Sequence, residues 1–148
     1  MKEDTSFRQE FLIKGGDFAG AGKASCEIKN LLKELGLSSQ VVRRVAIAAY
    51  EAEMNVIMYA WEGRFDLLIT PQKIRIIVED EGPGIENIDL AMREGYSTAT
   101  EEMRELGFGA GMGLPNIKKT SDRFLITSEP GRGTRLEMTI LTNGQRPQ

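Results

Sequence analysis

The stretch Glu51-Ala-Glu-Met-Asn55 precedes two glycine-containing segments, Asp80-Glu-Gly-Pro-Gly84 and Gly107-Phe-Gly-Ala-Gly-Met-Gly113. The first places a carboxylate and an amide one helical turn apart. The second ends an apolar strand in an acid and a tight turn, and the third frees the backbone to surround phosphate groups. Each segment is weak evidence alone, but their order predicts a pocket for a magnesium nucleotide, with ATP as the expected ligand.

Composition limits the partners and the number of domains. The 148 residues contain 19 Lys and Arg against 22 Asp and Glu, a net charge of -3. This charge is too mild and too mixed for a nucleic-acid groove, so nucleic acid is not expected as a partner. The length predicts a single domain over 1–148, with a frayed tail at 142–148. The basic pair Arg43-Arg44 is interpreted as part of a solvated helix face.

Scarce residue types exclude whole classes of site. The chain has no histidine, which excludes a Ser-His-Asp triad, a His-ligated zinc and histidine autophosphorylation within it. The single cysteine, Cys26, excludes an internal disulfide and is interpreted as a small buried residue on a helix. No apolar run approaches the roughly 20 residues that span a bilayer, and the first residues are unlike a signal peptide. We therefore expect a cytoplasmic chain with no membrane partner.

Apolar periodicity predicts the elements that surround the three segments. Strands are expected over 7–13, 64–70, 73–79, 123–128 and 134–141, and helices over 18–35, from Ser38 or Ser39 to about Trp61, over 88–94, and from about Gly113 to Asp122. Strands and helices are mixed along the chain without a repeating βαβ rhythm. The pattern predicts an α+β two-layer sandwich, with a mixed, mostly antiparallel sheet and helices on one face.

Glu51 and Asn55 lie on one face of the longer predicted helix. The asparagine offers a neutral oxygen to magnesium, and the glutamate can orient or deprotonate a nucleophile. Glu53 is predicted to point elsewhere, as an ordinary surface residue. A solvated surface pair is the alternative interpretation of Glu51 and Asn55, but their Ala, Val, Ile and Met neighbours favour a functional one.

Asp80 directly follows an apolar strand, where its carboxylate can accept a hydrogen bond from the exocyclic amine of adenine. Gly82 and Gly84 have no Cβ and so allow a flat ring to approach the backbone. Thr134 begins the last predicted strand, and its hydroxyl can meet the base directly or through water. A plain surface turn is the alternative interpretation of the segment around Asp80.

Four glycines, Gly107, Gly109, Gly111 and Gly113, alternate along the third segment. Their backbone N–H groups can surround phosphate oxygens, and the following helix adds its positive N-terminal end. The spacing of these glycines does not match the glycine pattern of dinucleotide-binding sites, and the sequence contains no P-loop motif. Arg104 precedes them and can reach a terminal phosphate. A flexible hinge and an exposed, salt-bridged arginine are the alternatives.

The ordered set resembles the GHKL ATPases, the superfamily of gyrase, the heat-shock chaperone ATPase, histidine kinases and the mismatch-repair ATPase. The resemblance covers about 51–134 and implies the Bergerat ATP-binding fold. It implies a general base, a magnesium ligand, a first glycine box around adenine, a second at a lid, and a threonine near the base. The implied general base is Glu51, and the implied magnesium ligand is Asn55. The first glycine box comprises Asp80, Gly82 and Gly84, the second comprises Gly107 to Gly113, and the threonine near the base is Thr134.

Two further segments, Gly95 to Thr98 and Gly109 to Asn116, are similar to the bacterial branch of anti-sigma factors and switch serine kinases. That resemblance implies phosphorylation, with magnesium and ATP, of a serine or threonine on a small partner with a sulphate-transporter and anti-sigma-antagonist fold. Some members sequester a sigma factor, and members are often dimers. The chain departs from the family at Tyr59, where a histidine is common.

Two alternatives to a kinase stay open at this point. The chain can be a non-catalytic anti-sigma or adaptor module in which ATP shapes a docking surface. It can also be a stand-alone catalytic domain like that of a histidine kinase, which transfers phosphate to a histidine on another chain.

Overall fold

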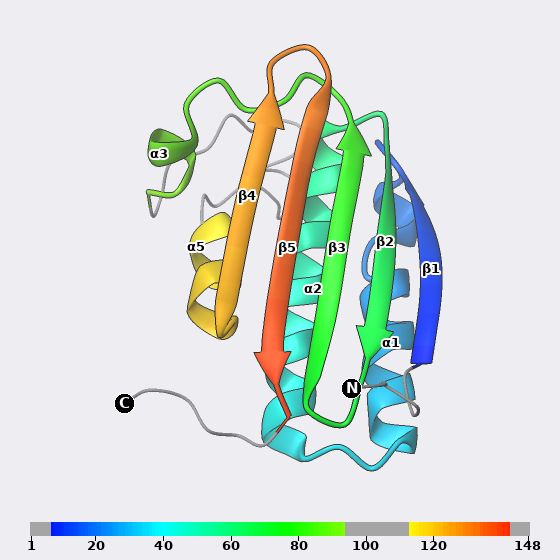
Figure 1. Ribbon diagram of the computed structural model, residues 1–148. Helices are drawn as coiled ribbons and strands as arrows, with labels where there is room; N and C mark the ends of the chain where they lie inside the picture. Colours follow the sequence, from blue (N-terminus) through cyan, green and yellow to red (C-terminus); the bar gives the residue numbers. More distant parts are fainter. Residues whose placement is uncertain (1–6, 94–112, 143–148) are drawn as a thin grey trace.

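The computed structural model describes residues 7–93 and 113–142, and five strands in these residues form one sheet (Figure 1). The spatial order is β1-β2-β3-β5-β4, and every neighbouring pair is antiparallel. The strands are β1 (Phe7–Lys14), β2 (Glu62–Ile69), β3 (Lys73–Glu81), β4 (Arg123–Glu129) and β5 (Gly133–Leu141). The predicted α+β architecture with a largely antiparallel sheet is confirmed.

Three helices cover one face of this sheet: α1 (Lys23–Glu34), α2 (Ser39–Tyr59) and α5 (Gly113–Thr120). Helix α2 lies behind the central strands and packs against both α1 and α5 (Figure 1). A single turn, α3 (Ile88–Ala91), follows the β3 strand. No helix among the described residues is long and apolar enough to span a membrane.

The core lies between the sheet and α2. Alternate residues of β2, β3 and β5 face the helices and are buried, whereas the residues between them lie on the open face, are more exposed, and in many cases carry charges. The buried set includes Phe65, Leu67, Ile74, Ile76, Met138 and Ile140 from the sheet and Val41, Val45, Ala48 and Ala52 from α2. Since each buried large aliphatic or aromatic side chain contributes about 1.5–3 kcal/mol, this layer fixes α2 on the sheet.

The segment predicted as one helix over 18–35 is divided in the structure. A 3₁₀ turn, η1 (Phe18–Gly20), precedes α1, and the Asp17 carboxylate accepts a hydrogen bond from the Gly20 N–H at its end. Gly22 then adopts a φ of +90°, a left-handed conformation that interrupts the helical path. Helical spacing of the apolar residues extended the prediction across this break.

The interpretations of Arg44 and Cys26 are wrong. Arg44 is buried rather than solvated: its Nη2 lies 2.7 Å from Asp122 Oδ2, and its Nε donates to the Thr120 carbonyl at 3.1 Å. This ion pair connects α2 to the residues that directly follow α5. Arg44 and Asp122 are 78 positions apart in the sequence. Cys26, interpreted as buried, is exposed.

Candidate nucleotide-binding site

Helix α2 presents Glu51 and Asn55 to the first turns of α5. The Asn116 side chain donates from Nδ2 to Glu51 Oε2 at 3.0 Å. A Cβ on Gly113 would lie 3.4 Å from Asn55 Oδ1 and 3.7 Å from Glu51 Oε1, so the start of α5 passes close to both polar groups. Because the first N–H groups of a helix have no partner within it, this junction directs positive backbone dipoles towards an acid and an amide.

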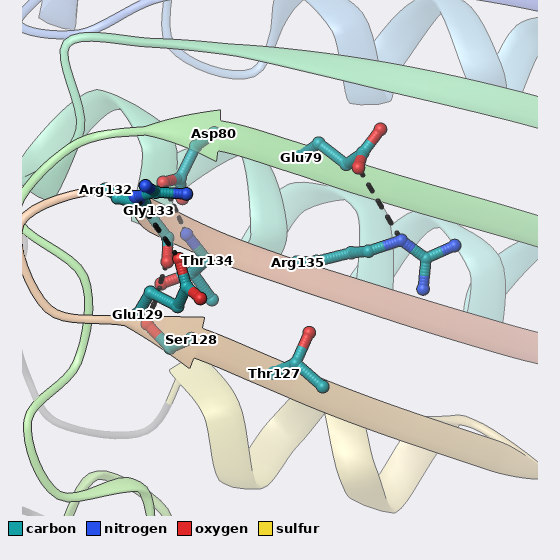
Figure 2. A pocket seen from close by; sticks show the side chains of 9 residues that line it. All are labelled: Glu79, Asp80, Thr127, Ser128, Glu129, Arg132, Gly133, Thr134 and Arg135. Carbon is teal, nitrogen blue, oxygen red and sulfur yellow. Dashed lines mark hydrogen bonds and ion pairs between the residues drawn. The ribbon is translucent and has the colours of Figure 1, made fainter.

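Asp80 lies near the end of β3, where its Oδ1 accepts a hydrogen bond from the Thr134 backbone N–H at 3.0 Å. A Cβ on Gly133 would clash with the Asp80 carbonyl, so glycine is required where β5 begins. Burial raises the pKa of the Asp80 carboxyl above its ordinary value, and the Thr134 hydrogen bond offsets part of that rise. Both residues line one pocket at this end of the sheet (Figure 2).

The turn after Asp80 needs its glycines for packing. A Cβ on Gly82 would lie 2.9 Å from the Ala60 Cα, directly after α2. Gly84 has a φ of +75°, and a Cβ there would clash with the carbonyl of Glu129. The turn therefore packs against both the C-terminal end of α2 and the β4–β5 connection. The approach of a flat ring to these glycines stays a prediction.

Ser128, on β4, is a residue of the site that sequence reasoning missed. Its Oγ accepts from the Ile85 N–H at 2.7 Å, donates to the Gly133 carbonyl at 3.0 Å, and lies 2.8 Å from Thr134 Oγ1. Ser128 lines the same pocket as Asp80 and Thr134 (Figure 2). A signal was present, since the alternation of β4 places this serine on the helix-facing side of the strand.

Glu53 is buried, which corrects its prediction as a surface residue. Its side chain accepts hydrogen bonds from the backbone N–H groups of Gly22 at 3.1 Å, Ala24 at 3.3 Å and Ser25 at 2.9 Å, and the residue is 2% exposed. The carboxylate therefore caps the N-terminus of α1 from another helix. The signal was the position of Glu53 on the apolar side of α2, one turn from Ala49 and Ile57.

The remaining predicted site residues lie outside the described residues. These are Arg104, Gly107, Gly109 and Gly111, together with the segment 95–98. Among the described residues, no group of three or more His, Cys, Asp or Glu is arranged to hold a metal ion. A single amide ligand such as Asn55 still suits magnesium, which keeps several waters and takes other oxygens from the phosphates of its nucleotide.

Three comparisons place the chain among known proteins. Residues 32–143 match the family model described as histidine kinase-, DNA gyrase B-, and HSP90-like ATPase. Over 113 residues the chain is 33% identical to the serine/threonine-protein kinase RsbT of Bacillus subtilis, covering 74% of this chain and 79% of that protein. Over 145 residues it is 30% identical to the anti-sigma F factor of Clostridium kluyveri, covering 95% of this chain and 96% of that protein. The mycobacterial sensor histidine kinase MprB shares the fold, with a TM-score of 0.50 and 16% identity over 95% of this chain and 100% of that chain.

Proposed function

We propose, because this chain belongs to the family of histidine kinase-, DNA gyrase B- and HSP90-like ATPases, that it transfers phosphate from ATP to a serine or threonine of a protein partner. The observation that carries the proposal is Glu51, held by Asn116 beside Asn55 where α2 meets the start of α5. The similarity to a serine/threonine-protein kinase supports the same reaction.

Glu51 is proposed as the general base. Asn116 occupies its Oε2, while its Oε1 accepts no hydrogen bond within the part of the chain that the structure describes. In the reaction, the partner's hydroxyl oxygen forms a bond to the γ-phosphorus and its proton passes to Glu51. The bond between that phosphorus and the bridging oxygen breaks, and ADP leaves with the electron pair. The protein contributes mainly position and electrostatic stabilisation.

Asn55 is proposed to hold magnesium through its amide oxygen, and the ion would supply positive charge against the triphosphate. The lack of a side chain at Gly113 leaves the space beside this oxygen open to phosphate groups. The start of α5 adds backbone N–H groups on the same side. Gly107, Gly109 and Gly111 are proposed to continue this phosphate contact, and Arg104 to reach the terminal phosphate.

Asp80 and Thr134 are proposed to bind the base. Asp80 uses Oδ1 for the Thr134 backbone, and its Oδ2 makes no hydrogen bond among the described residues, so one oxygen is available to an exocyclic amine. Gly82 and Gly84 shape the adjoining turn, as the first glycine box does in the resembled family. The raised pKa of Asp80 agrees with a partly dehydrated recognition site.

The proposed partner is a small protein with a sulphate-transporter and anti-sigma-antagonist fold, and the chain is proposed to act as a homodimer. A second function is favoured by the 30% identity to an anti-sigma F factor. In that case the chain sequesters a sigma factor, and ATP shapes the docking surface. The two functions share the nucleotide site and differ in the fate of the γ-phosphate.

Incubation with labelled ATP, magnesium and candidate antagonist-fold proteins tests the proposal. We expect acid-stable phosphate on a serine or threonine of the partner. A persistent complex without label would favour the sequestering function, whereas acid-labile label would indicate transfer to a histidine. A pull-down with and without magnesium ATP identifies the partner.

Calorimetry on Asp80→Asn tests the base site without any partner. The amide replaces one acceptor oxygen by a donor, so the affinity for magnesium ATP should fall by about tenfold or more. Unchanged affinity would contradict the assignment of the pocket at the end of β3.

A further inference from the structure

We infer that Ser128 is a specificity-determining residue for the nucleotide base, because its hydroxyl fixes the direction of the Thr134 hydroxyl. The inference rests on the proposed binding of ATP at Asp80 and Thr134. It concerns the choice between purines with an amino group and purines with an oxygen at position 6.

One arrangement of protons satisfies all three contacts of Ser128 at once. The Gly133 carbonyl can only accept, so the single Ser128 proton points to it across 3.0 Å. The Ile85 N–H occupies one lone pair of Ser128 Oγ at 2.7 Å. The remaining contact, 2.8 Å to Thr134 Oγ1, is a hydrogen bond only if Thr134 donates.

In this arrangement Thr134 has no proton to offer to a ligand. Its hydroxyl presents lone pairs to the pocket that it lines together with Asp80 (Figure 2). Asp80 presents its Oδ2, which is another acceptor, since Oδ1 already receives the Thr134 backbone N–H. Asp80 and Thr134 thus contribute two acceptors to the pocket from the adjacent strands β3 and β5. The pocket is also lined by Arg132 and Arg135, whose guanidinium groups form ion pairs with neighbouring glutamates.

Two acceptors suit the exocyclic amine of adenine, which has two protons, directly or through a bridging water. A 6-oxo purine places lone pairs at that position, facing the lone pairs of both Asp80 and Thr134. Thr134 can donate to this oxygen only if Ser128 turns its own proton towards Thr134. That inversion sacrifices the Ser128 hydrogen bond to the Gly133 carbonyl.

The loss of one internal hydrogen bond sets the size of the effect. A net hydrogen bond corresponds to about a three- to tenfold change in an equilibrium constant. Ser128 therefore adds a factor of this size to the discrimination against 6-oxo purines. In Ser128→Ala, the Thr134 hydroxyl rotates freely and donates without that cost, so this factor disappears.

The experiment compares the affinities of the full chain for magnesium ATP and magnesium ITP by calorimetry. ITP has hypoxanthine, which differs from adenine by an oxygen in place of the amine and by a proton on N1. We expect the ratio of the two affinities to fall about three- to tenfold in Ser128→Ala. The ratio is the appropriate quantity, because a partly unfolded sample lowers both affinities by the same factor.

Two controls separate this role from a structural one. Ser121→Ala removes the hydroxyl of a buried serine that has no hydrogen-bond partner among the described residues, and should leave the ratio unchanged. Thr134→Val removes the hydroxyl that Ser128 orients, so adding Ser128→Ala to this variant should change the ratio no further. If Ser128→Ala does not fold, Ser128→Cys replaces it, since a thiol is a weak donor and acceptor.

The outcomes distinguish the inference from the proposed function. A wild-type protein that binds ATP, combined with an unchanged ratio in the Ser128 variant, would overturn the inference and leave the ATP site intact. A further fall of the ratio when Ser128→Ala is added to Thr134→Val would overturn it as well. Failure of the wild type to bind magnesium ATP would overturn the proposed function and the inference together.

Discussion

Two glutamates, Glu51 and Glu53, lie two positions apart on α2 and have opposite surroundings. Both oxygens of Glu53 accept backbone N–H groups from the first turn of α1, and the residue is 2% exposed. Glu51 is half-buried and accepts a single hydrogen bond, from Asn116. The first is an acid whose hydrogen-bonding capacity is used within the fold, and the second keeps an oxygen for something else.

The contrast extends to Asp80, which resembles Glu51 more than Glu53. One of its oxygens accepts a backbone N–H, and the other has no partner among the described residues. Because a buried acid without partners is costly, a partly satisfied carboxylate in a pocket indicates a group that is completed by a ligand. An acid that is fully satisfied from within indicates a structural anchor.

The largest expected effect follows from removing the anchor. In Glu53→Ala, three N–H groups at the start of α1 lose their acceptor in a buried place, and the positive end of the helix loses its countercharge. We expect the free energy of unfolding, measured with urea, to fall by about 3–5 kcal/mol.

The matched control is Glu27→Ala, an exposed acid on α1 itself, which should change stability by less than about 0.5 kcal/mol. Glu53→Gln should fall between the two, since it keeps one acceptor oxygen. A loss below about 1 kcal/mol in Glu53→Ala would remove the distinction between anchor and site.

The second prediction concerns Glu51, where we expect a loss of phosphate transfer without a loss of stability. Glu51→Gln keeps an oxygen for Asn116 but cannot take a proton from the partner's hydroxyl, so phosphate transfer should slow by about 100-fold or more. Stability and ATP affinity should stay close to those of the wild type. Single-turnover transfer from labelled ATP gives the rate; transfer at the wild-type rate would make the base assignment wrong, and an unfolded variant would make Glu51 a second anchor.

Local sequence patterns predicted most of the fold and the positions that meet at the site. The alternation of Ile74, Ile76 and Val78 identified β3 and placed Asp80 near its end, and helical spacing put Glu51 and Asn55 on one face of α2. These predictions succeeded because the period of a strand or helix is a property of neighbouring residues.

Long-range partners could not be predicted in this way. Glu53 receives N–H groups from 28 to 31 residues away, Ser128 receives one from 43 residues away, and the Arg44 partner Asp122 is 78 residues away. All three are polar residues on the buried side of a helix or strand. This position indicates that each needs a hydrogen-bond partner, but it does not identify the partner. The fold decides which polar residues are anchors.

A smaller effect is expected at the residue that holds Glu51. Asn116→Ala leaves the carboxylate free to rotate, so phosphate transfer should slow by about tenfold, whereas the dissociation constant for ATP should hardly change. This separation of rate from affinity distinguishes a positioning role from damage to the pocket. Asn116→Gln should recover part of the rate because it restores an amide donor, and an equal loss of affinity and rate would argue against positioning.

The smallest effect concerns Asp80 and has the opposite sign to that of Glu53. Burial raises the pKa of its carboxyl in the folded protein, so folding is favoured when it is protonated, and this contribution is lost as the pH rises from the ordinary Asp value through the raised one. Asp80→Asn should therefore equal the wild type in stability in acid and exceed it at neutral pH, by less than about 1 kcal/mol because the group is partly solvated. Urea unfolding of both proteins across this pH range measures the difference. Equal stability at neutral pH would mean that Asp80 is compensated within the fold, as Glu53 is. If Asp80→Asn is more stable than the wild type at neutral pH but binds ATP more weakly, the Asp80 carboxylate lowers the stability of the fold and contributes to ligand binding.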